Sequence, residues 1–454
     1  MIFDFLKYCL DGKDNMSNVV ANIDWQQMYY FASKQAILGL CFEGIERLGR
    51  EYPDELKRNP IDRNLLMTWM AKAQQIHRQN MKVNAVAGKL FSLLKKGGMR
   101  CCVLKGQGNA LMYPNPYSRN PGDIDVWINA SREEITEYAK CHFKLEDDIR
   151  FHHLETTMDG VPVELHFFPG IMNNPVYNAR LQKWFKRNAD LQCSNVVSLP
   201  DGIGEIAIPT TAFNVIYQLT HLYHHFFDEG IGMRQIIDYF LVVCDFYKVY
   251  QKSSKITPSL FTIKEGSTSH PDPLTLRGEG GNRPTRCSEP LCSKDGGPSK
   301  VSPDCAGWDR RDAIEDMASD SAGASATVAH SSFAASSSST AFEVVQRELK
   351  YLGLWKFAGA VMYVLHEVLG LSEDKMIAPM DEKRGRLLLA EILEGGNFGR
   401  HFTKYAGFMH QSMGKKYFLK IWRNMHFVRY YPAEALCEPL FRTWHFFWRL
   451  KYKK

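Results

Sequence analysis

The sequence has no long apolar run. None of its segments reaches the ~20 consecutive apolar residues that a membrane-spanning helix requires. The first seven residues include Asp4 and lack the apolar stretch of a secretory leader. These absences argue against an integral membrane or secreted protein. We therefore expect a cytoplasmic protein without a transmembrane segment.

The cysteines do not form a disulfide framework. The chain has eleven, an odd number, and several lie inside apolar runs, such as Cys9, Cys101, Cys102 and Cys244. Buried cysteines of this kind behave as small hydrophobic residues in a reducing compartment. Three others lie in a stretch rich in Ser, Gly and Pro, and their spacing is not that of a zinc site; they are Cys287, Cys292 and Cys305.

The net charge of +6 is unevenly distributed. Residues 401–454 contain eleven Lys and Arg against two Glu, a local charge of +9 that leaves −3 for the rest of the chain. Aromatic residues are interleaved with these cations, including Tyr417, Trp422 and Tyr430 among Lys415, Lys416, Lys420, Arg423 and Arg429. Such a segment can bind RNA through phosphate contacts and base stacking. The alternatives are a solvated helix face over an aromatic core, or membrane-surface binding through residues 444–454.

The composition divides the chain into regions and predicts an α+β protein. Residues 1–95 have helical periodicity, residues 96–205 contain the candidate strands of a small mixed sheet, and residues 206–251 and 342–454 are again helical. Residues 252–341 are rich in Ser, Gly, Pro and Ala and poor in bulky aliphatic residues. Such a composition buries too little apolar surface to offset chain entropy, so we predict a long disordered insertion.

Several local signals place the elements. Helices are predicted over residues 25–47 and 62–96, with Asp62 as a cap and Gly97-Gly98 as the stop. Ser131 and Glu134 have the spacing of a capping box. Asp159-Gly160, the preferred two-residue turn, joins two strand-like arms over 151–158 and 161–168.

The strongest chemical signal is the acid pair in Gly122-Asp123-Ile124-Asp125-Val126-Trp127. Side chains two residues apart on a strand share a face, so Asp123 and Asp125 are predicted to lie side by side. Two like charges held together on a strand are costly unless a cation lies between them. Oxygen ligands suit Mg²⁺, so the pair predicts a magnesium site.

Two further segments complete this site. Lys105-Gly106-Gln107 follows a short apolar run, and a glycine turn beside a lysine can bind a phosphate. Downstream, Glu164 and His166 share one face of the second hairpin arm. Three carboxylates, Asp123, Asp125 and Glu164, can hold two Mg²⁺ ions. In this scheme Glu164 serves the catalytic metal or acts as base, and His166 contacts the substrate or packs as an ordinary hydrogen-bonded histidine.

These segments together resemble a known family. Leu104-Lys105-Gly106, Arg119-x-x-Gly122-Asp123-Ile124-Asp125 and Val163-Glu164-Leu165-His166 are similar to the motifs of the bacterial uncharacterised nucleotidyltransferases, within the polymerase-β-type nucleotidyltransferase superfamily. The runs from His221 to His225 and from Arg234 to Asp238 resemble the helical part of the same family. The resemblance covers residues 30–250. It implies a nucleotidyltransferase core over residues 96–205, with an NTP such as ATP as substrate.

The chain departs from the superfamily pattern at the turn, where a serine usually helps to hold the triphosphate and Gln107 stands instead. Nucleotide binding is then left to Lys105, Gly106, the backbone at Gln107 and Asn109. Arg119 offers a guanidinium that can bind a phosphate bidentately or form an ion pair with a nearby acid. His221 and His225 have the spacing of a metal pair but no evident third ligand, so we expect them to be structural or to contact the acceptor.

We therefore expect an Mg²⁺-dependent nucleotidyltransferase that moves a nucleoside monophosphate from an NTP to a hydroxyl acceptor and releases pyrophosphate. The acceptor, a small molecule, a protein or RNA, is not specified by the sequence. Two alternatives remain open. One is a catalytically inactive protein of the same fold that binds nucleotide or RNA, and the other is a toxin-like enzyme that modifies tRNA.

Overall fold

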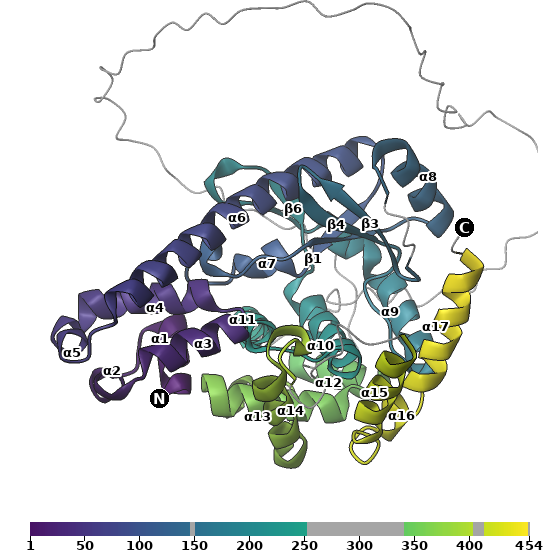
Figure 1. Ribbon diagram of the computed structural model, residues 1–454. Helices are drawn as coiled ribbons and strands as arrows, with labels where there is room; N and C mark the ends of the chain where they lie inside the picture. Colours follow the sequence, from purple (N-terminus) through teal and green to yellow (C-terminus); the bar gives the residue numbers. More distant parts are fainter. Residues whose placement is uncertain (146–149, 252–339, 403–412, 453–454) are drawn as a thin grey trace, which may run out of the picture. The chain divides into compact units, whose positions relative to one another are not determined.

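A mixed four-stranded sheet of order β1-β2-β4-β3 lies at the centre of the predicted core region (Figure 1). The computed structural model describes residues 1–145, 150–251, 340–402 and 413–452. Strands β1 and β2 are antiparallel, β2 and β4 are parallel, and β4 and β3 are antiparallel. The strands are β1 (Cys101–Leu104), β2 (Ile124–Ile128), β3 (His153–Met158) and β4 (Val161–His166). The predicted α+β class with a small mixed sheet is confirmed.

The two faces of this sheet pack against different helices. Val103, Val126 and Leu165 share a core with α6 (Arg63–Lys96) and α8 (Arg132–His142). On the opposite face, Cys102, Leu104 and Trp127 belong to a larger core. There the Trp127 ring stacks on Phe213 of α10 (Thr211–Asp228) with ring centroids 6.0 Å apart. Both faces of the sheet are therefore buried. Strand β2, which carries Asp125, is a central strand because it lies between β1 and β4.

The helical N-terminal region is confirmed, with one correction. The expected single helix over residues 25–47 is broken, because Ala36 has φ 56° and separates two helices. The buried side chain of Gln35 explains the break, since its amide donates to Ile392 O at 3.0 Å and accepts from Met233 N at 2.8 Å. The helices are α1 (Ile2–Asp11), α2 (Ser17–Asn22), α3 (Trp25–Lys34), α4 (Leu38–Glu51) and α5 (Pro53–Arg58).

The predicted caps and the hairpin turn form as expected. The carboxylate of Asp62 accepts from the first backbone amides of α6, which ends at Gly97. Ser131 and Glu134 form the capping box of α8. Asp159 and Gly160 both have positive φ and join β3 to β4. In contrast, the segment that begins at Lys105, predicted to be a turn, is helical from Gly106 onwards and forms α7 (Gly106–Ala110).

One helix, a small second sheet and two 3₁₀ turns lie in the segments before β2 and after β4. A helix, α9 (Pro175–Ser194), precedes a two-stranded sheet of β5 (Val196–Ser198) and β6 (Glu205–Ala207), which the sequence did not indicate. The two 3₁₀ turns of this region are η1 (Pro116–Ser118) and η2 (Pro200–Gly202).

The C-terminal region is helical, as expected. Helix α10 ends at Asp228, and Gly230 with φ 110° leads to α11 (Met233–Gln251). A capping box at Thr340 starts α12 one residue before the predicted boundary, and residues 252–339 of the predicted disordered insertion lie outside the described residues. The remaining elements are α12 (Ala341–Tyr351), α13 (Trp355–Leu369), η4 (Glu373–Lys375), α14 (Glu382–Gly395), η5 (Asn397–Gly399), α15 (Met413–Met425), α16 (Pro432–Ala435) and α17 (Glu438–Tyr452).

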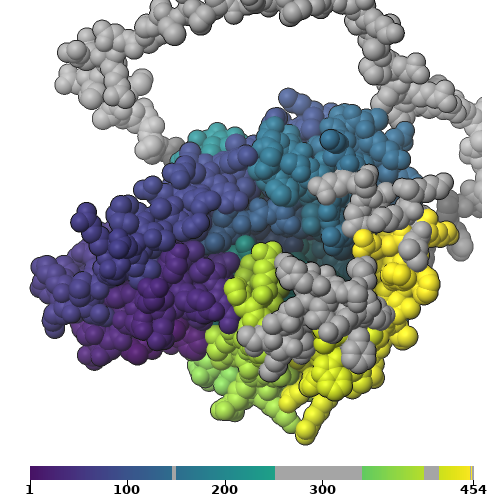
Figure 2. All heavy atoms as spheres, in the orientation of Figure 1, coloured from purple at the N-terminus to yellow at the C-terminus, as the bar shows by residue number. Residues whose placement is uncertain are grey.

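The N-terminal and C-terminal helices share one core. Phe5 and Leu40 of the first region belong to the same buried cluster as Tyr223 and Phe357 of the last. In the space-filling view the purple N-terminal helices lie directly against the green segment that includes α14 (Figure 2). Within the described residues, no helix is both long and apolar enough to cross a membrane.

Candidate active site

Three carboxylates lie in a row across the sheet. Strand register pairs Asp125 of β2 with Glu164 of β4, and Glu164 in turn with Glu155 of β3. Register partners project from the same face of a sheet, so these three side chains are neighbours. Asp125 is 5% exposed, and the structure brings it together with Glu164 as the sequence predicts.

Asp123 lies immediately before β2, which begins at Ile124. Asp123 is exposed, and the negative charge of Asp125 is the main cause that raises the pKa of its carboxyl group to about 6. Among the residues that the structure describes, the groups compact enough to hold a single ion contain Asp125, Glu164 and His166 but not Asp123. Asp123 therefore interacts electrostatically with Asp125, but it lies outside the compact group formed by Asp125, Glu164 and His166.

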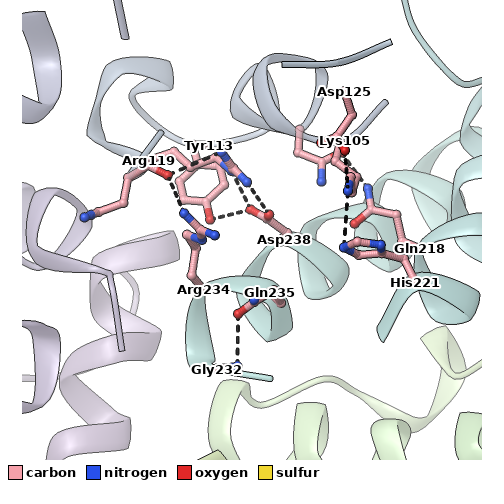
Figure 3. Close-up of polar contacts among 12 residues, drawn as sticks. Lys105, Tyr113, Arg119, Asp125, Gln218, His221, Gly232, Arg234, Gln235 and Asp238 are labelled. Atoms are coloured by element: carbon pink, nitrogen blue, oxygen red, sulfur yellow. Dashed lines mark hydrogen bonds and ion pairs between the residues drawn. The ribbon is translucent and has the colours of Figure 1, made fainter. Parts of the chain in front are cut away.

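Two cations balance the buried carboxylates. Lys105 Nζ lies 3.0 Å from Asp125 Oδ1 and 3.4 Å from His221 Nε2 (Figure 3). His166 Nε2 lies 3.0 Å from Asp125 Oδ1 and 3.1 Å from Glu164 Oε2. Lys105 and His166 therefore both lie at the acids. His166 has the packed, hydrogen-bonded arrangement that was one of its two alternatives, and Lys105, predicted to bind a phosphate, pairs with Asp125.

These contacts set the protonation states. Burial works to raise the pKa of Asp125, but the charge of Lys105 and the hydrogen bond from His166 outweigh it and lower the pKa. Glu164 behaves in the same way, with its pKa lowered by His166 against the effect of burial. Burial alone would lower the pKa of His166, and the two carboxylates instead raise it to about 9. At neutral pH the centre therefore consists of ionised Asp125 and Glu164 bridged by an imidazolium.

The backbone at Lys105 is unusual. Lys105 has φ 52° and ψ −136°, a conformation that residues with a side chain rarely adopt, and Gly106 has φ 40°. Such strain persists where the surrounding structure fixes it, and it is concentrated at functional sites. Here it directs the lysine from the end of β1 towards Asp125 while the chain turns into α7.

The other side chains of this turn serve packing. Gln107 is 4% exposed and its Nε2 donates to Asn84 Oδ1 of α6. Asn109 is 1% exposed and its Oδ1 accepts from Gln218 Nε2 of α10 at 2.6 Å. The side chains of Gln107 and Asn109 are thus hydrogen-bonded to neighbouring helices. The groups left for a ligand are the backbone of Gly106 and Gln107 and the Lys105 ammonium.

Arg119 forms the ion pair that was one of its two alternatives. Its Nε and Nη2 lie 2.9 and 2.7 Å from the two carboxylate oxygens of Asp238, which also accepts from Tyr113 Oη at 2.7 Å (Figure 3). This bidentate pair is buried, and it joins the segment before β2 to α11. We therefore do not retain Arg119 as a phosphate ligand.

A second guanidinium, that of Arg234, lies beside this pair. Its Nη1 donates to Asn120 O at 3.2 Å, while its buried Nε has no hydrogen-bond partner among the described residues. Burial and the charge of Arg119 lower the pKa of Arg234 to about 10, against the attraction of Asp238 and Asp123. Arg119 and Arg234 thus share the negative charges of Asp238 and Asp123, and Asp238 is already bound bidentately by Arg119.

The remaining histidines and C-terminal cations are placed as follows. The rings of His221 and His225 lie 4.3 Å apart, and neither belongs to a three-residue metal group among the described residues. Lys420 pairs with Asp228 at 3.1 Å, and the 4% exposed Arg423 donates to Phe226 O at 2.9 Å. These two cations bind α15 to α10, whereas the side chains of Lys415 and Lys416 lie outside the described residues.

Glu155 and Arg234 are the site residues that the sequence reasoning missed. The two-residue turn at Asp159-Gly160 fixes the register of the hairpin, and that register places Glu155 opposite Glu164. Glu155 could therefore have been found from the sequence. Arg234 could not, because its position depends on how α11 packs against the loop before β2.

Comparisons with known proteins agree with this geometry. A family model described as "Uncharacterised nucleotidyltransferase" matches residues 21–249, half of the chain. No curated protein matches the chain. A solved structure described as an antigenic nucleotidyltransferase-like protein from Paracoccidioides brasiliensis matches with 16% identity over 36% of this chain and 75% of that chain, with a TM-score of 0.25. The family match spans every predicted site residue, and the chain belongs to the uncharacterised nucleotidyltransferase family.

Proposed function

We propose that the chain is an Mg²⁺-dependent nucleotidyltransferase that moves a nucleoside monophosphate from an NTP to a hydroxyl acceptor. The observation that supports this most is the pairing of Asp125 with Glu164 across β2 and β4, with Lys105 Nζ 3.0 Å from Asp125 at the adjoining strand end. A carboxylate centre with a lysine at its edge can hold both a metal ion and the phosphates that the metal ion binds.

The residues present fit a divalent cation. Asp123, Asp125 and Glu164 offer only oxygen ligands, the kind that Mg²⁺ prefers. The pKa of Asp123, raised to about 6 chiefly by the charge of Asp125, records carboxylate repulsion that a bound cation would relieve. When bound, one or two Mg²⁺ ions would neutralise the triphosphate and favour ionisation of the attacking hydroxyl.

The other side chains have separate tasks in this proposal. The Lys105 ammonium and the Arg234 guanidinium bind phosphate oxygens of the NTP. Glu164 accepts the proton of the acceptor hydroxyl, whose oxygen forms a bond to the α-phosphorus. The bond from the α-phosphorus to the bridging oxygen breaks, and pyrophosphate leaves. Holding these groups in place supplies most of the rate increase, since positioning and electrostatics dominate such reactions.

One observation favours a second function, that of a nucleotide-binding protein without catalysis. The Gln107 side chain is buried against Asn84, so no hydroxyl is offered to the triphosphate where the superfamily usually has a serine. Calorimetry with ATP and Mg²⁺, followed by a turnover assay on the same sample, separates the two functions. Binding without turnover would support this second one.

The experiment for the proposed function is pyrophosphate release from each of the four NTPs in the presence of cell extract as a source of acceptors. We expect release by the wild type with Mg²⁺, and a loss of at least ~10²-fold in Asp123→Asn and Asp125→Asn. The exposed Glu137 on α8 provides a control, because Glu137→Gln removes a carboxylate of the same region without touching the site. Equal release by Asp125→Asn and the wild type would refute the proposal.

A further inference from the structure

Next to the carboxylates, the hairpin brings three histidines together. His152, His153 and His166 each offer a ring nitrogen, and these nitrogens lie within 4.8 Å of one another. The ring centroids are 4.2 Å apart for His152 and His153, and 5.1 Å apart for His153 and His166. His153 and His166 are register partners on β3 and β4, so the hairpin itself sets their proximity.

The second ring nitrogens of two of these histidines contact carboxylates. His166 Nε2 contacts Asp125 and Glu164, and His153 Nε2 lies 3.1 Å from Glu155 Oε1. In both rings the Nδ1 atom is buried and has no hydrogen-bond partner within the part of the chain that the structure describes. A histidine that binds a metal through one nitrogen usually donates its other N–H to a carboxylate. Both residues are buried, 3% and 4% exposed, and both have this arrangement.

The unpartnered nitrogen of His153 faces negative charge. Its Nδ1 lies 3.3 Å from Glu164 Oε2, outside hydrogen-bonding geometry. The His153 ring is 3% exposed, so the nearest polar neighbour of this buried Nδ1 atom is a carboxylate oxygen. Three imidazoles beside a carboxylate form a donor set for a metal cation, which would replace the proton that His166 carries at neutral pH.

We propose that His152, His153 and His166 form a binding site for a transition-metal dication, in the first place Zn²⁺. Imidazole nitrogens select Zn²⁺ and similar ions over Mg²⁺, which prefers oxygen, so this site is chemically distinct from the one formed by Asp123 and Asp125. Zn–N bonds of ~2.0–2.1 Å need donors about 3.4 Å apart in a tetrahedral site, so a small closing of the rings suffices. Three protein ligands leave a fourth position for water or a phosphate oxygen.

The test uses the full chain, stripped with a chelator and dialysed against micromolar Zn²⁺ at pH 7.5 without NTP or Mg²⁺. Metal analysis should find one Zn²⁺ per chain in the wild type. His152→Gln and His153→Gln should each weaken binding by at least ~10-fold. His142→Gln, an exposed histidine on α8, is the matched control and should retain the ion. Circular dichroism verifies folding, and the half-buried His152 provides the variant least able to disturb it.

A second measurement separates this site from the magnesium site. In Co²⁺-substituted protein, visible absorption of the tetrahedral type should appear in the wild type and in Asp123→Asn, and disappear in His153→Gln. Because no nucleotide is involved, failure of the nucleotidyltransferase proposal would leave this result unchanged. Wild-type protein that retains no Zn²⁺, equal retention by His153→Gln and His142→Gln, or loss of the ion in Asp123→Asn would each overturn the inference.

Discussion

At the scale of single residues, Asp123 and Asp125 show how position decides chemistry. They are separated by one residue, yet the pKa of Asp123 is raised and that of Asp125 is lowered. The difference arises because Lys105 and His166 contact Asp125, whereas Asp123 mainly feels the charge of Asp125. Asp123 is thus the carboxylate whose ionised form a bound cation would stabilise most.

This leads to a prediction for metal-free protein. Asp123 has a raised pKa, so its ionised form destabilises the fold above about pH 6. Asp123→Asn should increase the free energy of unfolding by about 1 kcal/mol at pH 7.5, a value reduced for solvent screening of this exposed residue. Urea unfolding with chelator measures it. The gain should shrink as the pH falls from 6 towards 4, and a variant less stable than wild type at pH 7.5 would contradict the account.

His166 makes the opposite prediction. Its pKa is raised from the ordinary 6.5 to about 9, so its stabilising contribution is complete below pH 6.5 and is lost as the pH rises through about 9. Metal-free wild type should lose about 2–3 kcal/mol of unfolding free energy over that range. His166→Gln should not show this loss, while His142→Gln should follow the wild type. Parallel pH profiles for His166→Gln and the wild type would disprove the imidazolium bridge.

At the scale of elements, close helix packing positions the loop before β2. A Cβ atom added at Gly39 of α4 would lie 2.2 Å from Ser118 O of η1, which no side-chain movement can relieve. Gly49 in the same helix has open space around it. Two glycines in one helix therefore have different reasons for being glycine, and only Gly39 supports the site.

The pair gives an internally controlled prediction. Gly39→Ala should destabilise the protein by about 1–3 kcal/mol through overpacking. Gly49→Ala should stabilise it by about 0.5–1 kcal/mol through helix propensity. Thermal unfolding of both variants tests this. If Gly39→Ala melts at or above the wild-type temperature, the close approach of α4 and η1 is wrong.

The features that the sequence predicted best are helix caps and the hairpin turn, which form within short segments of the chain. The cap at Asp62, the capping box at Ser131 and the hairpin turn at Asp159-Gly160 depend on residues a few positions apart, so pattern and turn chemistry were sufficient. The break at Ala36 and the burial of Gln107 were not predictable in this way. Each depends on partners distant in sequence, as when Gln35 binds Met233 and Ile392.

At the scale of the whole molecule, the helical regions on either side of the sheet do not have separate cores. Buried residues from α1, α4, α10 and α13 belong to one cluster. The site depends on the same packing, since α10 supplies His221 to Lys105 and α11 supplies Asp238 to Arg119. The N-terminal and C-terminal helical regions, predicted with boundaries at residues 95, 205 and 251, therefore pack as one unit.

A shared core predicts that the regions cannot fold alone. A fragment of residues 1–251 would expose the apolar surface that α12, α13 and α14 cover, and it should be insoluble or aggregated. Co-expression with residues 340–454 should restore soluble protein as a complex. A soluble 1–251 fragment with a cooperative thermal transition would show that the core is divisible.

The central claim is transfer of the nucleoside monophosphate part of an NTP, and labelled NTPs test it most directly. Full-length protein would be incubated with cell extract, Mg²⁺ and NTPs labelled at either the α- or the γ-phosphate. Macromolecules or small acceptors should gain the α-label but no γ-label, and only in the presence of Mg²⁺. Asp125→Asn should abolish this transfer of the α-label. Transfer of γ-label, or α-label transfer undiminished in Asp125→Asn, would contradict the central claim.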